Sequence, residues 1–140
     1  MTVGRPELLP VPLRSMLQAV LALAFILAVL RFGRGQGRLN RVMRLLGWAS
    51  RRAAEPAEAE EAVQAIHAVR RAALLPVGRV ACLEESAAVT LMLAAVGRRV
   101  RWCHGVAADP VRLHAWVVTC DGETVVEPVG TARFTVLRTI

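Results

Sequence analysis

Three residues in the second half of the 140-residue chain have side chains that act together in nucleophilic catalysis. Cys82 begins a predicted helix in the run ACLEESAAVTLML, where free backbone N–H groups and the positive end of the helix dipole stabilise an anion. We therefore expect Cys82 to carry more thiolate at neutral pH than an ordinary cysteine. His114 begins a predicted strand in LHAWVV, and Glu127 ends the strand that follows.

A cysteine, a histidine and an acid in this order can hold a thiolate as an ion pair, with the carboxylate fixing the imidazole tautomer. Glu127 reaches His114 if the strands flanking Asp121-Gly122, a strong hairpin signal, pair across that turn. From the residues alone a structural interpretation also stays open. A cysteine at a helix start is more often a small buried hydrophobe, and a histidine on a strand is more often packed or hydrogen-bonded.

The cysteine count argues against a disulfide framework. The chain has three cysteines, Cys82, Cys103 and Cys120, with no CxxC pair, which favours a reduced, cytoplasmic protein. A zinc site would have to draw on Cys103, His104, His114 and Cys120, but Cys103 and His104 are sequence neighbours that point to opposite faces of a strand. We therefore expect no metal and no cofactor.

Helices are expected first along the chain. One begins near Leu13, after two prolines, and ends at the glycines at positions 33, 35 and 37. The others are expected over residues 39–50, from Glu55 and Pro56 to about 74, and over 82–96, where Gly97 ends the last. The third carries an apolar stripe at 59, 63, 66 and 69.

Strands are expected after Gly97, because the hydrophobic period changes to two. Val100, Trp102, His104 and Val106 alternate with polar or small residues, which predicts a strand with one covered face. After a turn at Asp109 and Pro110, further strands are expected over residues 113–120, 123–126 and 134–137. Helices followed by antiparallel strands indicate an α+β fold with the N-terminal helices packed against a small antiparallel sheet.

The positive charge is concentrated in residues 1–54, which hold nine arginines and one glutamate of a chain with net charge +7. With no aromatic platform or recognition motif beside the arginines, nucleic acid is the weakest candidate partner, behind acidic lipid and acidic protein. The same segment contains 16 uncharged residues, 15–30, too few to span a membrane well as a helix. We expect this helix to be buried in the core or in a partner's groove, or else to lie in a membrane surface.

Several motifs resemble those of a known enzyme family. The runs ACLEES, RWCHGV, LHAWVV, the DG hairpin, VVEP and FTVLRTI are similar to the stand-alone leader peptidases of lasso-peptide biosynthesis. That family has a transglutaminase-like, papain-like cysteine protease fold. The resemblance covers about residues 58–140, and the basic, leucine-rich N-terminal helices also look like those of the family. Together with the charge distribution, it divides the chain into basic, apolar N-terminal helices over 1–54, expected to dock to a partner or a membrane, and a protease core over 55–140.

The resemblance implies that Cys82 is the nucleophile, His114 the general base and acid, and an acid after the hairpin the third member. Glu127 in VVEP matches that acid, although many relatives have Asp there. Asp121 is the competing candidate, but a residue at the tip of a DG turn should face solvent. Glu85 departs from the family, which usually has Arg at that position, so any substrate contact made there is in doubt.

The resemblance further implies a peptidase, cytoplasmic or associated with the membrane, that removes the leader from a ribosomally made precursor peptide. A separate leader-recognition protein would deliver the precursor, and a macrolactam cyclase would act on the freed amine. The N-terminal helices are then the expected docking surface. Two other hypotheses are a catalytically silent partner-binding scaffold of the same fold and a membrane-surface protein anchored by those helices.

Overall fold

The computed structural model describes residues 10–32, 37–74, 80–108, 110–127 and 129–140. The helices in these ranges are α1 (Leu13–Arg31), α2 (Gly37–Arg52), α3 (Ala59–Ala72) and α4 (Cys82–Ala95). The strands are β1 (Glu55–Pro56), β2 (Arg98–Arg99), β3 (Arg101–Ala107), β4 (Arg112–Val118) and β5 (Thr135–Thr139), and a short 3-10 helix, Val129–Arg133, precedes β5. This order of helices and strands confirms the α+β prediction.

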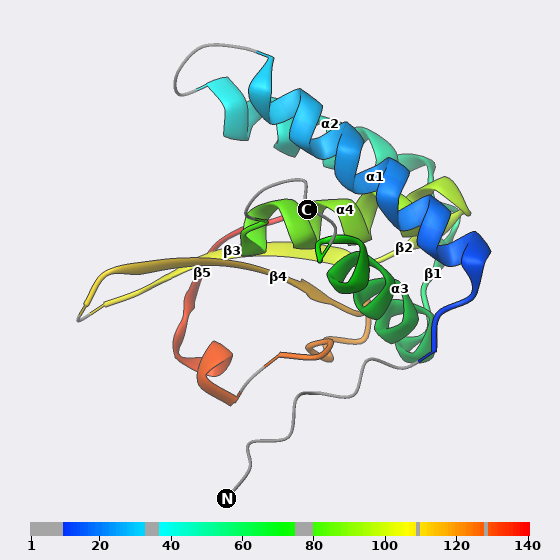
Figure 1. The fold of residues 1–140 in the computed structure, drawn as a ribbon. Coiled ribbons are helices and arrows are strands. Elements are labelled where there is room, and N and C mark those ends of the chain that lie inside the picture. The colour runs from blue at the N-terminus through cyan, green and yellow to red at the C-terminus, as the bar shows by residue number, and fades with distance from the viewer. Residues whose placement is uncertain (1–9, 33–36, 75–79, 109, 128) are drawn as a thin grey trace, which may run out of the picture.

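The elements form layers with α4 in the middle (Figure 1). α4 lies on one face of the sheet of β3, β4 and β5, α1 and α2 cover its outer side, and α3 packs alongside. α4 is apolar on nearly every side, as expected for a helix that has neighbours all round. The irregular segment between β4 and β5 lies across the other face of the sheet.

One apolar core joins side chains of all four helices to the sheet. Its largest fully buried members include Ile26, Leu46, Val69, Val89 and Trp102. Each such side chain contributes about 1.5–3 kcal/mol by leaving water. Residues of α1 and α2 therefore help to stabilise the same core as the second half of the chain.

α1 places only one of its faces in this core. Ala19, Ala22, Leu23 and Ile26 are buried, while a row of large apolar side chains spaced four residues apart is exposed. The helix has 19 residues, because it extends beyond the uncharged run at both ends. Within the described part of the chain, α1 is the helix whose length and hydropathy would allow it to cross a membrane. Of its most apolar 18-residue window, 22% is buried inside the protein.

β3 is the central strand of the three-stranded sheet and pairs antiparallel with β4 and β5. Gly105 lies opposite His114 in this register, next to an irregularity in the β3–β5 pairing. A Cβ on Gly105 would lie 2.7 Å from the carbonyl oxygen of Thr135 and 2.8 Å from the Trp116 ring, so a side chain does not fit there. The expected single covered face of β3 is wrong: Cys103 and Gly105 are also buried, because the irregular segment covers the second face.

Two further expectations are corrected. Glu55 and Pro56 do not begin a helix: they form β1, which pairs in parallel with β2, and the Ala57 N–H donates to the Arg99 carbonyl at 2.8 Å. The expected strand over 123–126 is reduced to a bridge between Val118 and Thr124. Val125 turns into the core and Val126 has a left-handed φ of 50°, which takes the chain out of the extended conformation.

Three sequence predictions fall outside the described residues. They are the helix-ending glycines at positions 33 and 35 and the turn residue at position 109.

Candidate active site

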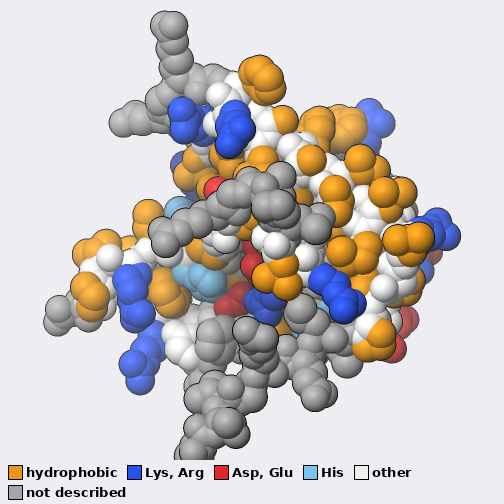
Figure 2. Space-filling model, viewed as in Figure 1, with side chains coloured by type: hydrophobic (Ala, Val, Ile, Leu, Met, Phe, Trp, Pro, Cys, Tyr) orange, Lys and Arg blue, Asp and Glu red, His pale blue; other side chains and the backbone are white. Residues whose placement is uncertain are grey.

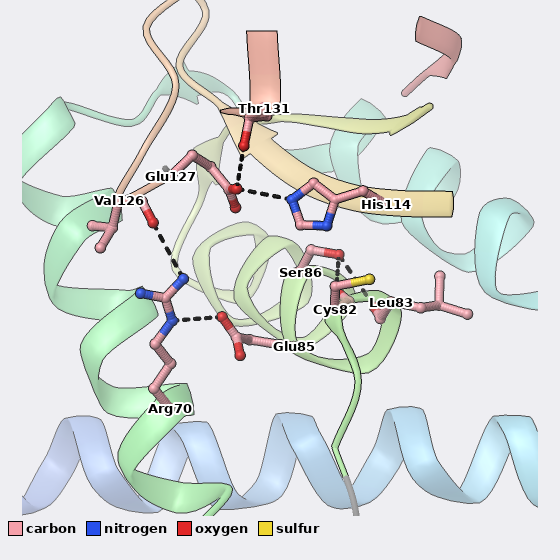
Figure 3. Close-up of polar contacts among 9 residues, drawn as sticks. All are labelled: Arg70, Cys82, Leu83, Glu85, Ser86, His114, Val126, Glu127 and Thr131. Carbon is pink, nitrogen blue, oxygen red and sulfur yellow. Dashed lines mark hydrogen bonds and ion pairs between the residues drawn. The ribbon is translucent and has the colours of Figure 1, made fainter. Parts of the chain in front are cut away.

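A cleft of about 280 Å³ lies between the first turns of α4, the strand β4 and the irregular segment. Cys82, His114 and Glu127, the three residues singled out in the sequence, all line it. The other lining residues come from α3, α4 and β4: Ile66, Arg70, Glu85, Ser86, Val89, Ala115, Trp116 and Val117. Figure 3 shows how the polar members of this set lie.

Cys82 is the first residue of α4, and hydrogen bonds fix that end of the helix. Glu84 accepts the N–H of Ala81 at 3.0 Å, which caps the first turn. The Ser86 hydroxyl donates to the Cys82 carbonyl at 2.6 Å and accepts the indole N–H of Trp102, a fully buried residue of β3, at 2.9 Å. The backbone that carries the thiol is therefore tied directly to the sheet.

His114 projects from β4 into the cleft between aromatic rings. Its imidazole stacks on Trp116, two residues along the same face of the strand, at a centroid distance of 5.6 Å and an interplanar angle of 14°. Phe134 contacts it at a tilt, with centroids 5.3 Å apart. One ring nitrogen, Nε2, lies 2.8 Å from Glu127 Oε2, and the other faces the Cys82 side of the cleft (Figure 3).

Glu127 meets the imidazole from the irregular segment rather than from a strand. Its side chain is 9% exposed, and Oε2 also accepts the hydroxyl of Thr131 at 2.9 Å. Asp121, the competing acid, lies exposed in the turn with Gly122, whose φ is 98°. The carboxylate that contacts His114 is therefore that of Glu127.

Sequence reasoning missed Arg70 and Thr131. Arg70 Nε donates to Glu85 Oε1 at 2.7 Å, so the acid at position 85 is engaged in an ion pair between α3 and α4. Arg70 Nη2 also donates to the Val126 carbonyl at 3.2 Å. The signal for Arg70 was present, because it follows Ile66 by one helical turn and thus continues the apolar stripe of α3 toward the cleft.

The other two cysteines lie away from this cleft. Cys103 does not line the cleft. It is buried on β3 opposite Trp116, where burial raises the pKa of its thiol and a contact with Thr139 Oγ1 at 3.9 Å opposes that rise. The Cys120 thiol lies 3.5 Å from the Arg99 carbonyl. All three cysteines are free thiols. In the described ranges, no group of three or more His, Cys, Asp or Glu side chains is arranged to hold a metal ion.

The geometry has the components of nucleophilic acyl transfer. A thiol at a helix start, an imidazole and an imidazole-bound carboxylate share one cleft, and the free N–H groups of the first turn of α4 provide donors for a developing oxyanion.

Burial lowers the pKa of His104, which is on β3 outside this cleft, with a smaller effect from Arg138. Because it does not line the cleft, His104 is not part of the group formed by Cys82, His114 and Glu127.

Comparison with known proteins relates the chain to a family. A family model described as "Transglutaminase-like superfamily" matches residues 25–139 of the chain. No curated protein and no solved structure matches the chain.

Proposed function

The chain belongs to the transglutaminase-like superfamily, and on that basis we propose that it is a cysteine peptidase that removes the leader from a lasso-peptide precursor. The superfamily includes cysteine peptidases. The observation that carries the proposal is the meeting of Cys82, His114 and Glu127 in one cleft. The resemblance of the runs around Cys82 and His114 to leader peptidases supports the narrower substrate.

In the proposed reaction the Cys82 thiolate attacks the carbonyl carbon of the bond that joins leader and core peptide. The tetrahedral intermediate collapses to a thioester as protonated His114 gives its proton to the leaving amine, which becomes the N-terminus of the core peptide. A water molecule, deprotonated by His114, then hydrolyses the thioester and releases the leader as a carboxylate. Glu127 holds the imidazole in the orientation and tautomer that both steps need.

The exposed face of α1 is the proposed docking surface for the leader-recognition protein or the cyclase. Leu13, Leu17, Leu21 and Phe25 are between 49% and 86% exposed, although each is a large apolar side chain. Figure 2 shows hydrophobic side chains gathered along this part of the molecule, with basic side chains around them. A contiguous apolar surface of this kind is typical of an interaction site.

A membrane surface is the alternative occupant of the same face, because Arg14 and Arg31 stand at the two ends of α1. Substituting Leu17→Ser and Leu21→Ser together separates the two cases. Loss of binding to the recognition protein, with no binding of the wild-type protein to anionic liposomes in flotation, supports protein docking. Flotation of the wild-type protein that the double variant loses supports the membrane.

The function is tested by incubating the protein with a precursor peptide encoded beside it, in the presence of the recognition protein. Mass spectrometry should show two products whose masses sum to that of the precursor plus one water. A leader peptide ending in an electrophilic ketone should attach to Cys82, which digestion and sequencing would locate. An intact precursor together with an unlabelled Cys82 would contradict the proposal and favour a catalytically silent scaffold.

A further inference from the structure

Arg70 lies where three parts of the molecule meet. From α3, its Nε donates to Glu85 Oε1 on α4 at 2.7 Å, and its Nη2 donates to the Val126 carbonyl of the irregular segment at 3.2 Å (Figure 3). The Arg70 and Glu85 side chains are 34% and 26% exposed. The guanidinium therefore donates from two of its nitrogens to two different acceptors, with a planar geometry that a lysine ammonium does not reproduce.

The residue that Arg70 contacts has a strained backbone. Val126 has a φ of 50°, a conformation that β-branched residues rarely adopt, and such conformations persist where surrounding contacts hold them. On one side Val125 is anchored in the core, being 3% exposed. On the other side is Glu127, whose carboxylate contacts His114. The orientation of the Val126 peptide thus sets the direction in which the Glu127 side chain leaves the backbone.

We propose that Arg70 and Glu85 form a positioning pair that directs Glu127 onto His114, an inference that rests on the proposed peptidase function. Arg70 holds the Val126 carbonyl, and Glu85 holds the guanidinium in the orientation that allows this. Thr131 acts on the carboxylate itself, so backbone and side chain of this segment are fixed by separate contacts. The pair acts through Glu127 and touches neither Cys82 nor His114 in the described contacts.

Because Arg70 and Glu85 also line the cleft, a substrate contact is the competing explanation, and kinetics separates the two. For Arg70→Gln we expect kcat for precursor cleavage to fall about 10- to 100-fold, with KM within twofold of the wild type. Glu85→Gln keeps an acceptor for Nε and should lose less than tenfold. The kcat of Arg70→Lys should lie between those of the wild type and Arg70→Gln, because the ammonium keeps the charge but not the planar geometry. Arg71→Gln, the neighbouring arginine on the same helix, is the matched control and should leave kcat unchanged.

A second measurement does not depend on turnover. The imidazole Nε2 proton held by Glu127 should give a slowly exchanging, downfield NMR signal in the resting protein. That signal should persist in Arg71→Gln and be lost or broadened in Arg70→Gln. If the wild-type protein shows the signal but cleaves no precursor, the peptidase proposal fails while the positioning pair is still tested by the signal.

Three results would overturn the inference. A raised KM at unchanged kcat would make Arg70 a substrate contact. An unchanged kcat and an unchanged Nε2 proton signal in Arg70→Gln would show that the pair positions nothing. If Arg70→Gln does not fold, Arg70→Lys and Glu85→Gln decide the matter. Wild-type kinetics and a wild-type signal in both of these variants would overturn the proposal equally.

Discussion

The three residues of the candidate site are supplied by two regions that are built differently. Cys82 and His114 come from a helix and a strand whose positions are set by the core: α4 has neighbours on all sides, and its first turn is tied through Ser86 to Trp102. Glu127 comes from the irregular segment, which the structure describes over residues 119–127 and 129–134. Near the site this segment is held by individual polar contacts of Arg70 and Thr131, as well as by Val125 in the core.

Because of this difference, substitutions in the two regions should affect stability and activity to different extents. A change inside the packed region alters many contacts at once, so it should affect unfolding as well as catalysis. A change to a polar side chain of the irregular segment at the cleft, such as Glu127 or Thr131, removes one or two hydrogen bonds, so it should affect catalysis with little effect on unfolding. The expected exception is the sulfur of Cys82, because its proposed role is chemical and its side chain is only partly buried against the core.

That exception gives the largest expected effect. Cys82→Ala should abolish precursor cleavage while leaving the thermal unfolding midpoint close to that of the wild type, because the thiolate makes the attack. Cys103→Ala and Cys120→Ala should keep substantial activity. Iodoacetamide should modify Cys82 faster than Cys103 near neutral pH, since burial raises the pKa of the Cys103 thiol and keeps it protonated. Cleavage by the Cys82→Ala protein would remove the nucleophile assignment.

Glu127→Gln should show the next largest effect, and in activity alone. Loss of the carboxylate misorients the imidazole, so kcat should fall by a factor on the order of 10² to 10⁴ with KM little changed. Glu127→Asp should retain more activity, because it keeps the charge on a shorter side chain. Asp121→Asn, in the exposed turn, is the control and should cost little. If Asp121→Asn is inactive and Glu127→Gln keeps nearly normal kcat, the acid that orients His114 is Asp121 and not Glu127.

Two glycines compare the regions directly in terms of stability. Gly105→Ala places a methyl group against the Thr135 carbonyl and the Trp116 ring in the sheet, and overpacking of this kind costs about 1–3 kcal/mol of unfolding free energy. Gly130→Ala lies in the irregular segment, where no described atom comes within 4 Å of the added Cβ. Urea denaturation should show a lowered midpoint for the first and a near wild-type midpoint for the second. Equal midpoints would break the comparison.

Thr131→Val should show the smallest effect. The isosteric change removes one hydrogen bond to the Glu127 carboxylate but leaves the contacts with His114 and Arg70 in place. A hydrogen bond of net worth about 1 kcal/mol corresponds to a loss of kcat of roughly tenfold or less. Steady-state kinetics and thermal unfolding of the same sample measure both quantities. A loss as large as that of Glu127→Gln would mean that Thr131, rather than the positioning pair, directs the acid.

The same division explains what could be predicted from the sequence. The helix at Cys82 and the strand at His114 were predicted because hydrophobic period, a glycine stop and the change of period are local signals. Glu127 was selected on a hairpin that does not extend past the bridge of Val118 with Thr124. Glu127 does contact His114 in the structure, although not through the strand pairing that was predicted.

The contacts of Arg70 could not be predicted, because they depend on how α3 packs beside α4 and on where a non-repetitive segment passes. The left-handed backbone at Val126 is unpredictable for the same reason, since a valine carries no local preference for it. The parallel pairing of β1 with β2 joins residues more than forty positions apart through two residues each, which is too short for a periodic signal. The catalytic roles of Cys82, His114 and Glu127 stay predictions until the variants are measured.

The strand β5 has a consequence for how the protein behaves in concentrated solution. The strand order β4-β3-β5 makes it an edge of the sheet, and every residue in it is exposed, including Val136 and Leu137. An exposed apolar edge is a template on which another copy can pair and start aggregates. Arg138 interrupts this apolar run with a charge that pairing would strip of water, and its contact with Met43 Sδ at 3.4 Å holds the side chain toward α2. We therefore expect Arg138, which lies outside the cleft, to oppose this pairing between copies.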